Sequence, residues 1–174
     1  MSKAVLISIR PKWCELIANG TKTVEVRKTR PKLQTPFKCY IYCTMDHPYI
    51  SVFCGELDKL NYRTNTVGRC NGKVIGEFTC DRIYELAPLN HAPDDVEKQA
   101  CLTREEIVNY LKGTGYGWRI SGLRIYDKPR ALSKLCRPYE CDDCDAKWAT
   151  DCNACHDKGK IKRPPQSWRY VEEG

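Results

Sequence analysis

The amino-acid sequence predicts a fold of the α+β class, in which strands form the body of the domain and short helices flank it. Two observations support this prediction. Several stretches alternate apolar and polar residues with the period of a β-strand, whereas two short stretches have the apolar period of an amphipathic helix. The chain has 174 residues, of which 41% are apolar, so we expect one domain with its own core and one insertion.

The first predicted helix follows an apolar stretch at the start of the chain. Pro11 suits the first position of a helix. Trp13, Leu16 and Ile17 then recur at helical spacing and form one apolar stripe. Gly20 suits the left-handed residue that ends a helix, so we expect the helix to stop just before it.

After Gly20 the period of the sequence changes from that of a helix to that of a strand. Thr23, Glu25 and Arg27 share one face of this strand, which predicts a charged wall of a binding cleft. Lys22 has the opposite parity, and it can join this face only if the chain is still turning, which a glycine permits. The alternative is an edge strand with a solvated charged face.

Further strands are predicted from the same alternation. Within residues 36–44, Phe37 and Ile41 share a face with Cys39 and Cys43. The two cysteines are therefore predicted to be small core residues rather than ligands. The other predicted strands cover residues 1–9, 73–80, 118–120, 123–126 and 166–171, with a turn at 127–129.

The second predicted helix opens with a capping box. Thr103 and Glu106 have the spacing at which a helix-capping hydroxyl and a carboxylate each accept from the other's backbone N–H. Ile107, Tyr110 and Leu111 follow as its apolar stripe. Gly113 and Gly115 are predicted to end this helix.

Positive charge is concentrated at the start of the chain. Residues 1–38 hold nine Lys/Arg and two Asp/Glu, a balance of +7, whereas the other 136 residues hold twenty of each. A local basic surface attracts phosphates, so the charge favours a nucleic acid, a nucleotide or another anionic partner. The alternative is that these residues only keep this face of the protein soluble.

Two C-x-x-C pairs lie near the C-terminus, separated by seven residues. Each pair can provide two thiolates to one tetrahedral ion, so we predict a closed, structural zinc knuckle in an insertion at 136–160. Cys136 and His156 are alternative ligands without paired spacing, and the alternative to a metal site is a thiol-rich loop. The four predicted zinc ligands are Cys141, Cys144, Cys152 and Cys155.

The cysteine content also bears on the compartment. The chain has twelve cysteines, and its apolar start is too short for a secretion signal. Both features predict a reducing cytoplasm, with thiols either buried or bound to metal. No apolar run approaches the roughly 18 residues of a membrane-spanning helix, so we expect no membrane association.

Several motifs along the chain belong together. They are Ser8-Ile9-Arg10-Pro11-Lys12-Trp13, Ile17, Gly20-Thr21-Lys22-Thr23-Val24-Glu25-Val26-Arg27, Gly72-Lys73-Val74-Ile75-Gly76-Glu77-Phe78, Gly115-Tyr116-Gly117-Trp118 and Pro164-Pro165-Gln166-Ser167-Trp168. They resemble the signature of the ASCH domain, a family of the PUA-like superfamily of small β-barrels associated with RNA and modified nucleobases. The resemblance implies a PUA-like barrel of residues 1–135 and 161–174, flanked by short helices and interrupted by the zinc-knuckle insertion.

The resemblance also implies that a basic cleft centred on the GTKTVEVRK motif binds a nucleic acid, a nucleotide or a modified base. Lys22 and Arg27 can neutralise a phosphate, and Glu25 can accept a hydrogen bond from an exocyclic amine, as carboxylates do from cytosine. Tryptophans can stack on a base or belong to the core. The implied ligand-binding residues are Lys12, Trp13, Lys22, Thr23, Glu25, Arg27, Trp118 and Trp168. The implied partners are RNA, single-stranded nucleic acid or a nucleotide.

Catalysis is the first alternative function. Some small ASCH proteins are acetylcytidine amidohydrolases with a lysine after the glycine, a threonine three residues later and a glutamate before the second helix. Lys22 matches the lysine, but Glu25 stands at the threonine position. The glutamate position falls near Ala100, with Glu97 nearly one turn away. Some members of the family are ribonucleases, and such an enzyme could use Lys22 and Glu25 as catalytic groups with Arg27 on the phosphate.

The threonine and the glutamate of the amidohydrolase pattern are both absent from their positions, which favours a binding protein over an enzyme. A second alternative is a small sequestering or inhibitory protein that binds a nucleotide or a protein partner. A histidine is absent from the motif stretch, so acid–base chemistry there would rest on the lysine and the glutamate.

Overall fold

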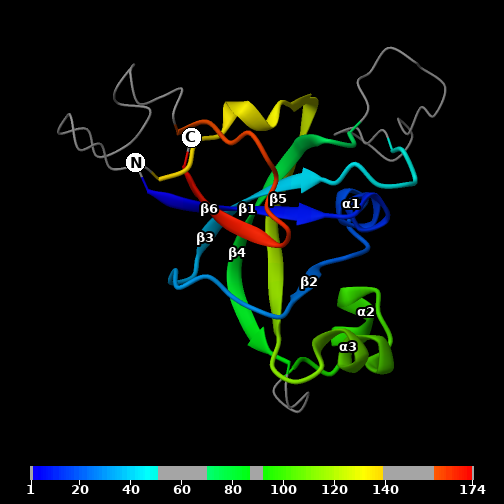
Figure 1. Cartoon of the computed structure of the whole chain (residues 1–174). Helices are drawn as coiled ribbons and strands as arrows, with labels where there is room; N and C mark the ends of the chain where they lie inside the picture. Colours follow the sequence, from blue (N-terminus) through cyan, green and yellow to red (C-terminus); the bar gives the residue numbers. More distant parts are fainter. Residues whose placement is uncertain (1, 51–69, 87–91, 139–158, 174) are drawn as a thin grey trace.

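The computed structural model describes residues 2–50, 70–86, 92–138 and 159–173. Within these residues, six strands form one mixed sheet in the order β2-β5-β4-β3-β1-β6, which curls into a half-barrel with few helices (Figure 1). The strands are β1 (Lys3–Ile9), β2 (Val24–Arg27), β3 (Phe37–Cys43), β4 (Lys73–Glu85), β5 (Tyr116–Arg130) and β6 (Trp168–Glu172). The helices are α1 (Pro11–Ala18), α2 (Val96–Ala100) and α3 (Arg104–Leu111), with a 3-10 turn at Leu132–Lys134. None of the helices described is long and apolar enough to cross a membrane.

The topology brings the ends of two strands together. β1 and β3 are parallel neighbours, and every other pair in the sheet is antiparallel. Ile9 lies opposite Cys43 in the register, and the backbone N–H of Thr44 donates to the Ile9 carbonyl over 2.9 Å. The chain therefore leaves both strands at the same end of the half-barrel, which is where polar side chains can meet.

Side chains connect the edge strand β6 to β5 and to the segment that follows the other edge strand, β2. The rings of Trp118 on β5 and Trp168 on β6 lie 6.0 Å apart. The Trp168 Nε1 donates to Thr29 Oγ1 over 3.0 Å, and the Lys32 backbone N–H donates to the Tyr170 hydroxyl over 2.8 Å. These contacts join the segment after β2 to β6, so the curl is closed by side chains rather than by a continuous backbone ladder. The described sheet is thus a half-barrel, where the sequence predicted a barrel.

Bulges cause the other departures from the predicted strands. The two strands predicted at 118–120 and 123–126 form one long strand, β5, which also includes the predicted turn at 127–129. Gly122 has φ +54° within it, and the pairing with β4 shifts register three times. Because a bulge moves following side chains to the other face, Ile75 and Phe78 both reach the main core.

The predicted core positions of β3 are confirmed. Cys39 and Cys43 are fully buried and pack in the main core with Ile41 and Trp118. Tyr40, on the other face of the strand, belongs to a second apolar cluster that Leu135 and Ile161 cover. Both faces of the sheet are therefore buried around β3.

The predicted helices are confirmed, and one short helix is additional. Gly20 follows α1 with φ +78°, and α3 starts with both hydrogen bonds of the capping box between Thr103 and Glu106. The additional helix, α2, has only five residues and no side-chain cap. The sequence therefore contained neither a capping signal nor an apolar period that could predict it. Ala100 of α2 packs with Ile107 of α3 and with β2, which fixes both helices beside the motif strand.

The ends of the predicted insertion lie side by side. The backbone N–H of Arg137 donates to the Gly159 carbonyl, and that of Ile161 donates to the Leu135 carbonyl. The described residues on the two sides of 139–158 therefore meet at one place on the domain. The four predicted zinc ligands lie outside the described residues, so the zinc site stays a prediction.

Candidate functional site

A pocket of about 490 Å³ opens at the end of the half-barrel where β1 and β3 end. α1, β2 and the α2–α3 region surround it, together with the segment before β6. Its size falls within the range of small-molecule sites. The residues that line it are Ser8, Arg10, Trp13, Lys22, Glu25, Val26, Arg27, Thr44, Asp46, Leu102, Glu106, Tyr110 and Gln166.

Three buried charges form one wall of the pocket. Lys22, Glu25 and Arg27 are 2%, 6% and 7% exposed. The Glu25 carboxylate lies between the two cations: its Oε1 is 2.9 Å from Arg27 Nη2, and its Oε2 is 3.5 Å from Lys22 Nζ. Buried charges need partners, and each member of this row has one. The row therefore presents a fixed carboxylate to the pocket with its charge neutralised from both sides.

The turn after α1 brings Lys22 into this row. β2 begins only at Val24, and Lys22 directly follows the turn at Asn19 and Gly20 and the bend at Thr21, so strand parity does not apply to it. Its backbone N–H donates to the Leu16 carbonyl over 2.9 Å, and its Nζ donates to the Ala100 carbonyl over 2.7 Å. The condition set by the sequence, that the chain must still be turning at Lys22, is therefore met.

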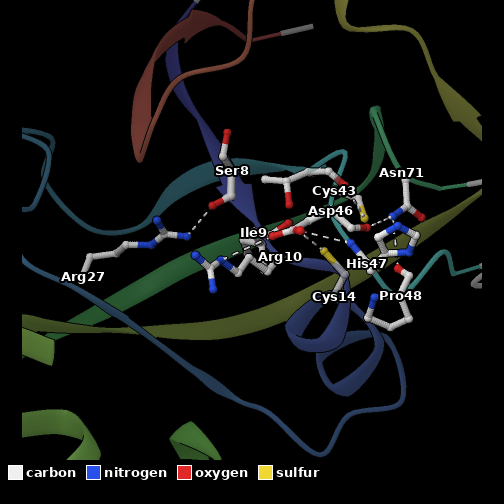
Figure 2. Close-up of polar contacts among 11 residues, drawn as sticks. Ser8, Ile9, Arg10, Cys14, Arg27, Cys43, Asp46, His47, Pro48 and Asn71 are labelled. Carbon is white, nitrogen blue, oxygen red and sulfur yellow. Dashed lines mark hydrogen bonds and ion pairs between the residues drawn. The ribbon is translucent and has the colours of Figure 1, made fainter.

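Arg27 connects three parts of the fold. Its Nη2 donates to the Ser8 carbonyl over 2.6 Å, a contact visible in Figure 2, and its Nη1 lies 3.3 Å from Ser167 Oγ. Ser8 in turn donates from its hydroxyl to the Pro165 carbonyl over 2.6 Å. The guanidinium thus joins β2 to β1 and to the segment before β6, so it has a structural role in addition to lining the pocket.

The loop after β3 forms part of the rim and is held by one side chain. The Asn71 amide donates to the carbonyls of Asp46 and Pro48 (Figure 2). Its side-chain oxygen accepts from the Ile50 N–H. Asp46 faces Arg10 across the rim at 3.8 Å, and both side chains are exposed. One buried amide therefore holds the loop that carries the acidic rim residue.

Trp13 provides the aromatic surface of the pocket. Its ring contacts two ammonium groups, the Lys12 Nζ at 4.7 Å and the Lys22 Nζ at 5.1 Å from the ring centroid. Lys22 is buried, whereas Lys12 is exposed. The pocket lining includes Trp13 and Lys22 but not Lys12, so a planar ligand in the pocket would meet this indole beside the buried cation.

The charges of the pocket lining cancel. Arg10, Lys22 and Arg27 face Glu25, Asp46 and Glu106. Backbone and side-chain hydrogen bonds from Thr103 hold the pKa of Glu106 below its usual value, which keeps this rim carboxylate ionised. The pocket is thus a mixed polar site, and the excess positive charge of the N-terminal region lies outside it.

The structure places the predicted ligand-binding residues in two groups. Trp13, Lys22, Glu25 and Arg27 line the pocket, whereas the other four do not. Lys12 contacts the Trp13 ring without lining the pocket, and the backbone of Thr23 is bonded to Gln99 and Ile120. Trp118 is fully buried, and Trp168 packs against the core.

Several lining residues had no signal in the sequence. Thr44, Asp46 and Leu102 come from loops that only the tertiary fold brings together. Tyr110 belonged to the predicted apolar stripe of its helix but is 44% exposed and faces the pocket. Ser8, Arg10 and Glu106 lie in motifs that the sequence did show, although it assigned them no role at the site.

The chain is similar to one known domain family in part of its sequence and in its fold. Residues 7–79 match the family model of the ASCH domain, a span that contains α1, the charged row and the rim loop. Over residues 7–79 the chain is similar to the ASCH domain, and its fold is consistent with an ASCH domain protein. ASCH domains are generally thought to bind RNA.

Solved structures with a similar fold come from Zymomonas mobilis. A tyrosine-to-phenylalanine variant of its ASCH protein superposes with a TM-score of 0.52 and 18% identity, over 99% of this chain and 92% of that one. Another structure of the same protein gives a TM-score of 0.50 and 20% identity, over 98% and 88%. At these identities the likeness shows the fold alone. No curated protein sequence matches the chain significantly.

Proposed function

We propose that the pocket binds the base of a nucleotide, free or within nucleic acid, and that Glu25 accepts a hydrogen bond from the exocyclic amine of that base. The position of Glu25 carries the proposal. It is a buried carboxylate on the wall of an open pocket of ligand size, held in place from both sides by Arg27 and Lys22. Preorganised acceptors of this kind discriminate between bases by about 1–3 kcal/mol.

The remaining walls suit a planar, polar ligand. Trp13 offers a ring face, and base–aromatic stacking contributes about 1–3 kcal/mol per base. The lining balances three cations against three carboxylates, so a neutral base enters without a net electrostatic penalty. The ASCH assignment adds the general association of this domain with RNA.

Calorimetric titration with cytidine, adenosine and uridine tests the proposal. Cytidine and adenosine carry an exocyclic amine and should bind more tightly than uridine, which has a carbonyl there. Glu25→Gln should reduce this preference by about tenfold or more, because an acceptor is replaced by a group that also donates. Equal binding of the three nucleosides to the native protein, or an unchanged preference in the variant, would contradict the proposal.

A matched control separates base recognition from loss of charge. Glu105 on α3 is exposed and does not line the pocket. Glu105→Gln changes the net charge by the same amount and should leave the preference unaltered. Circular dichroism of both variants verifies that they are folded at the titration temperature.

Catalysis is the alternative function, and turnover assays on variants of the charged row can detect it. Lys22 Nζ donates to both Glu25 and the Ala100 carbonyl, and Ala100 stands where the amidohydrolase pattern has a glutamate. Glu97 instead accepts from the Arg104 backbone N–H over 2.6 Å, and it does not line the pocket. We therefore propose a binder. Turnover of RNA or acetylcytidine that disappears in Lys22→Ala would assign an enzyme instead.

A further inference from the structure

We propose that the segment Lys28-Thr29-Arg30-Pro31-Lys32, the cationic strip, binds the phosphates of a single-stranded RNA whose base occupies the pocket. The inference rests on the proposed base pocket and specifies its ligand as a polynucleotide rather than a free nucleoside. Charge, rigidity and position of the strip each support it.

The strip carries the charge that the pocket lacks. The pocket lining is balanced, whereas residues 26–45 contain no Asp or Glu. Lys28, Arg30 and Lys32 are exposed, and within the described part of the chain none of them pairs with a carboxylate. Unneutralised cations on one short segment are the usual footprint of phosphate contacts.

The fold holds the backbone of the strip in place. Thr29 accepts from the Trp168 Nε1, Pro31 is buried, and the Lys32 backbone N–H donates to the Tyr170 hydroxyl. A segment held on both sides of Arg30 loses little backbone freedom when a ligand binds. The strip is therefore preorganised, unlike a basic tail that only solubilises a surface.

The strip starts at the rim of the pocket. Lys28 follows directly after Arg27, which lines the pocket, and its Nζ lies 5.3 Å from the ring centroid of Tyr110, another lining residue. The Arg30 guanidinium lies 5.9 Å from the ring centroid of Tyr116. A strand whose base enters the pocket can thus continue over cations interleaved with aromatic rings, the arrangement that single-stranded nucleic acids favour.

Three ligands with one base chemistry test the inference: cytidine, cytidine monophosphate and a six-nucleotide oligocytidine RNA. The oligonucleotide should bind the native protein at least tenfold more tightly than cytidine at 50 mM salt. Each phosphate contact on a single strand contributes a slope of about −0.7 to log K against log salt. For three contacts, affinity should fall by about 20-fold between 50 and 200 mM salt, whereas cytidine affinity should stay constant.

The deciding variant is the triple replacement Lys28→Gln, Arg30→Gln and Lys32→Gln. It should remove the advantage of the oligonucleotide and its salt dependence without changing cytidine affinity. The matched control replaces three exposed cations elsewhere with glutamine and should behave as the native protein. Its positions are Arg82, Arg124 and Lys128.

The outcomes separate this inference from the proposed function. If cytidine binds and the triple variant leaves oligonucleotide affinity unchanged, the phosphate strip is wrong and the base pocket stands. If the oligonucleotide binds through the strip but Glu25→Gln has no effect on it, the strip acts independently of the pocket and the inference fails. If none of the three ligands binds, the base pocket itself is refuted.

Discussion

Replacing Glu25 by glutamine should destabilise the protein, because it removes the only carboxylate shared by two buried cations in the described structure. The Arg27 contact is 2.9 Å and the Lys22 contact is 3.5 Å, and all three residues are less than a tenth exposed. Breaking a buried ion pair costs about 3–5 kcal/mol, since a charge is left without its partner. The pocket admits solvent on one side, so we expect a loss of about 3 kcal/mol.

Urea denaturation followed by circular dichroism measures this loss. For a chain of this size, about 3 kcal/mol corresponds to a decrease in Tm of roughly 6–12 °C. Stability of single domains is about 5–15 kcal/mol, so the variant should still fold at low temperature, where its binding can be measured. The exposed Glu105→Gln control should change the unfolding free energy by no more than about 0.5 kcal/mol.

A double-mutant cycle refines the result. Lys22→Met should destabilise less than Glu25→Gln, because Glu25 keeps its shorter contact with Arg27. The two changes together should be less than additive, since they remove one shared interaction. An unfolding free energy of Glu25→Gln within 0.5 kcal/mol of the native value would refute the account of a buried, mutually dependent charge row.

Three further outcomes are expected. Protein purified without chelators should contain close to one zinc per chain, which Cys144→Ser should lose; elemental analysis without stoichiometric metal would refute the zinc knuckle. Burial raises the pKa of Cys80 from 9.0 to about 12, so its thiol should resist alkylation at pH 8 until the protein unfolds. The same shift means that stability is retained below pH 9 and falls as the pH rises from 9 towards 12, because the unfolded chain loses this proton first. Gly20→Ala should lower the free energy of unfolding by about 1–2 kcal/mol, because Gly20 has φ +78°. A Cβ at this position meets no atom within 4 Å, so the loss comes from the backbone conformation alone. Gly20→Asn should lower the free energy of unfolding less in the same denaturation assay.

Local patterns were sufficient for much of the fold. The helix after Pro11, the capping box at Thr103 and the inward face of β3 were predictable because each depends on residues a few positions apart. The length of β5 was not, because Gly122 reads as a break in a strand pattern, whereas in the sheet it occupies a bulge that lets the strand continue. Pairing with β4 decides this, and pairing is a long-range property.

In the candidate site, too, some residues were predictable from the sequence and others were not. Lys22, Glu25 and Arg27 were predictable because they share one motif, and the position of Gly20 explained how Lys22 could join them. Asp46 and Leu102 were not, because they reach the pocket from loops remote in the sequence. The cancellation of charge in the pocket was also hidden, since it depends on which acidic residues the fold brings to the basic motif.

A crystal structure of the protein with the six-nucleotide oligocytidine RNA tests the central claim most directly. We expect one cytosine in the pocket, with its exocyclic nitrogen about 2.7–3.2 Å from a Glu25 carboxylate oxygen and its ring beside Trp13. The next phosphates should lie against Lys28 and Arg30. An RNA bound on another face, with no base within hydrogen-bonding distance of Glu25, would contradict the account.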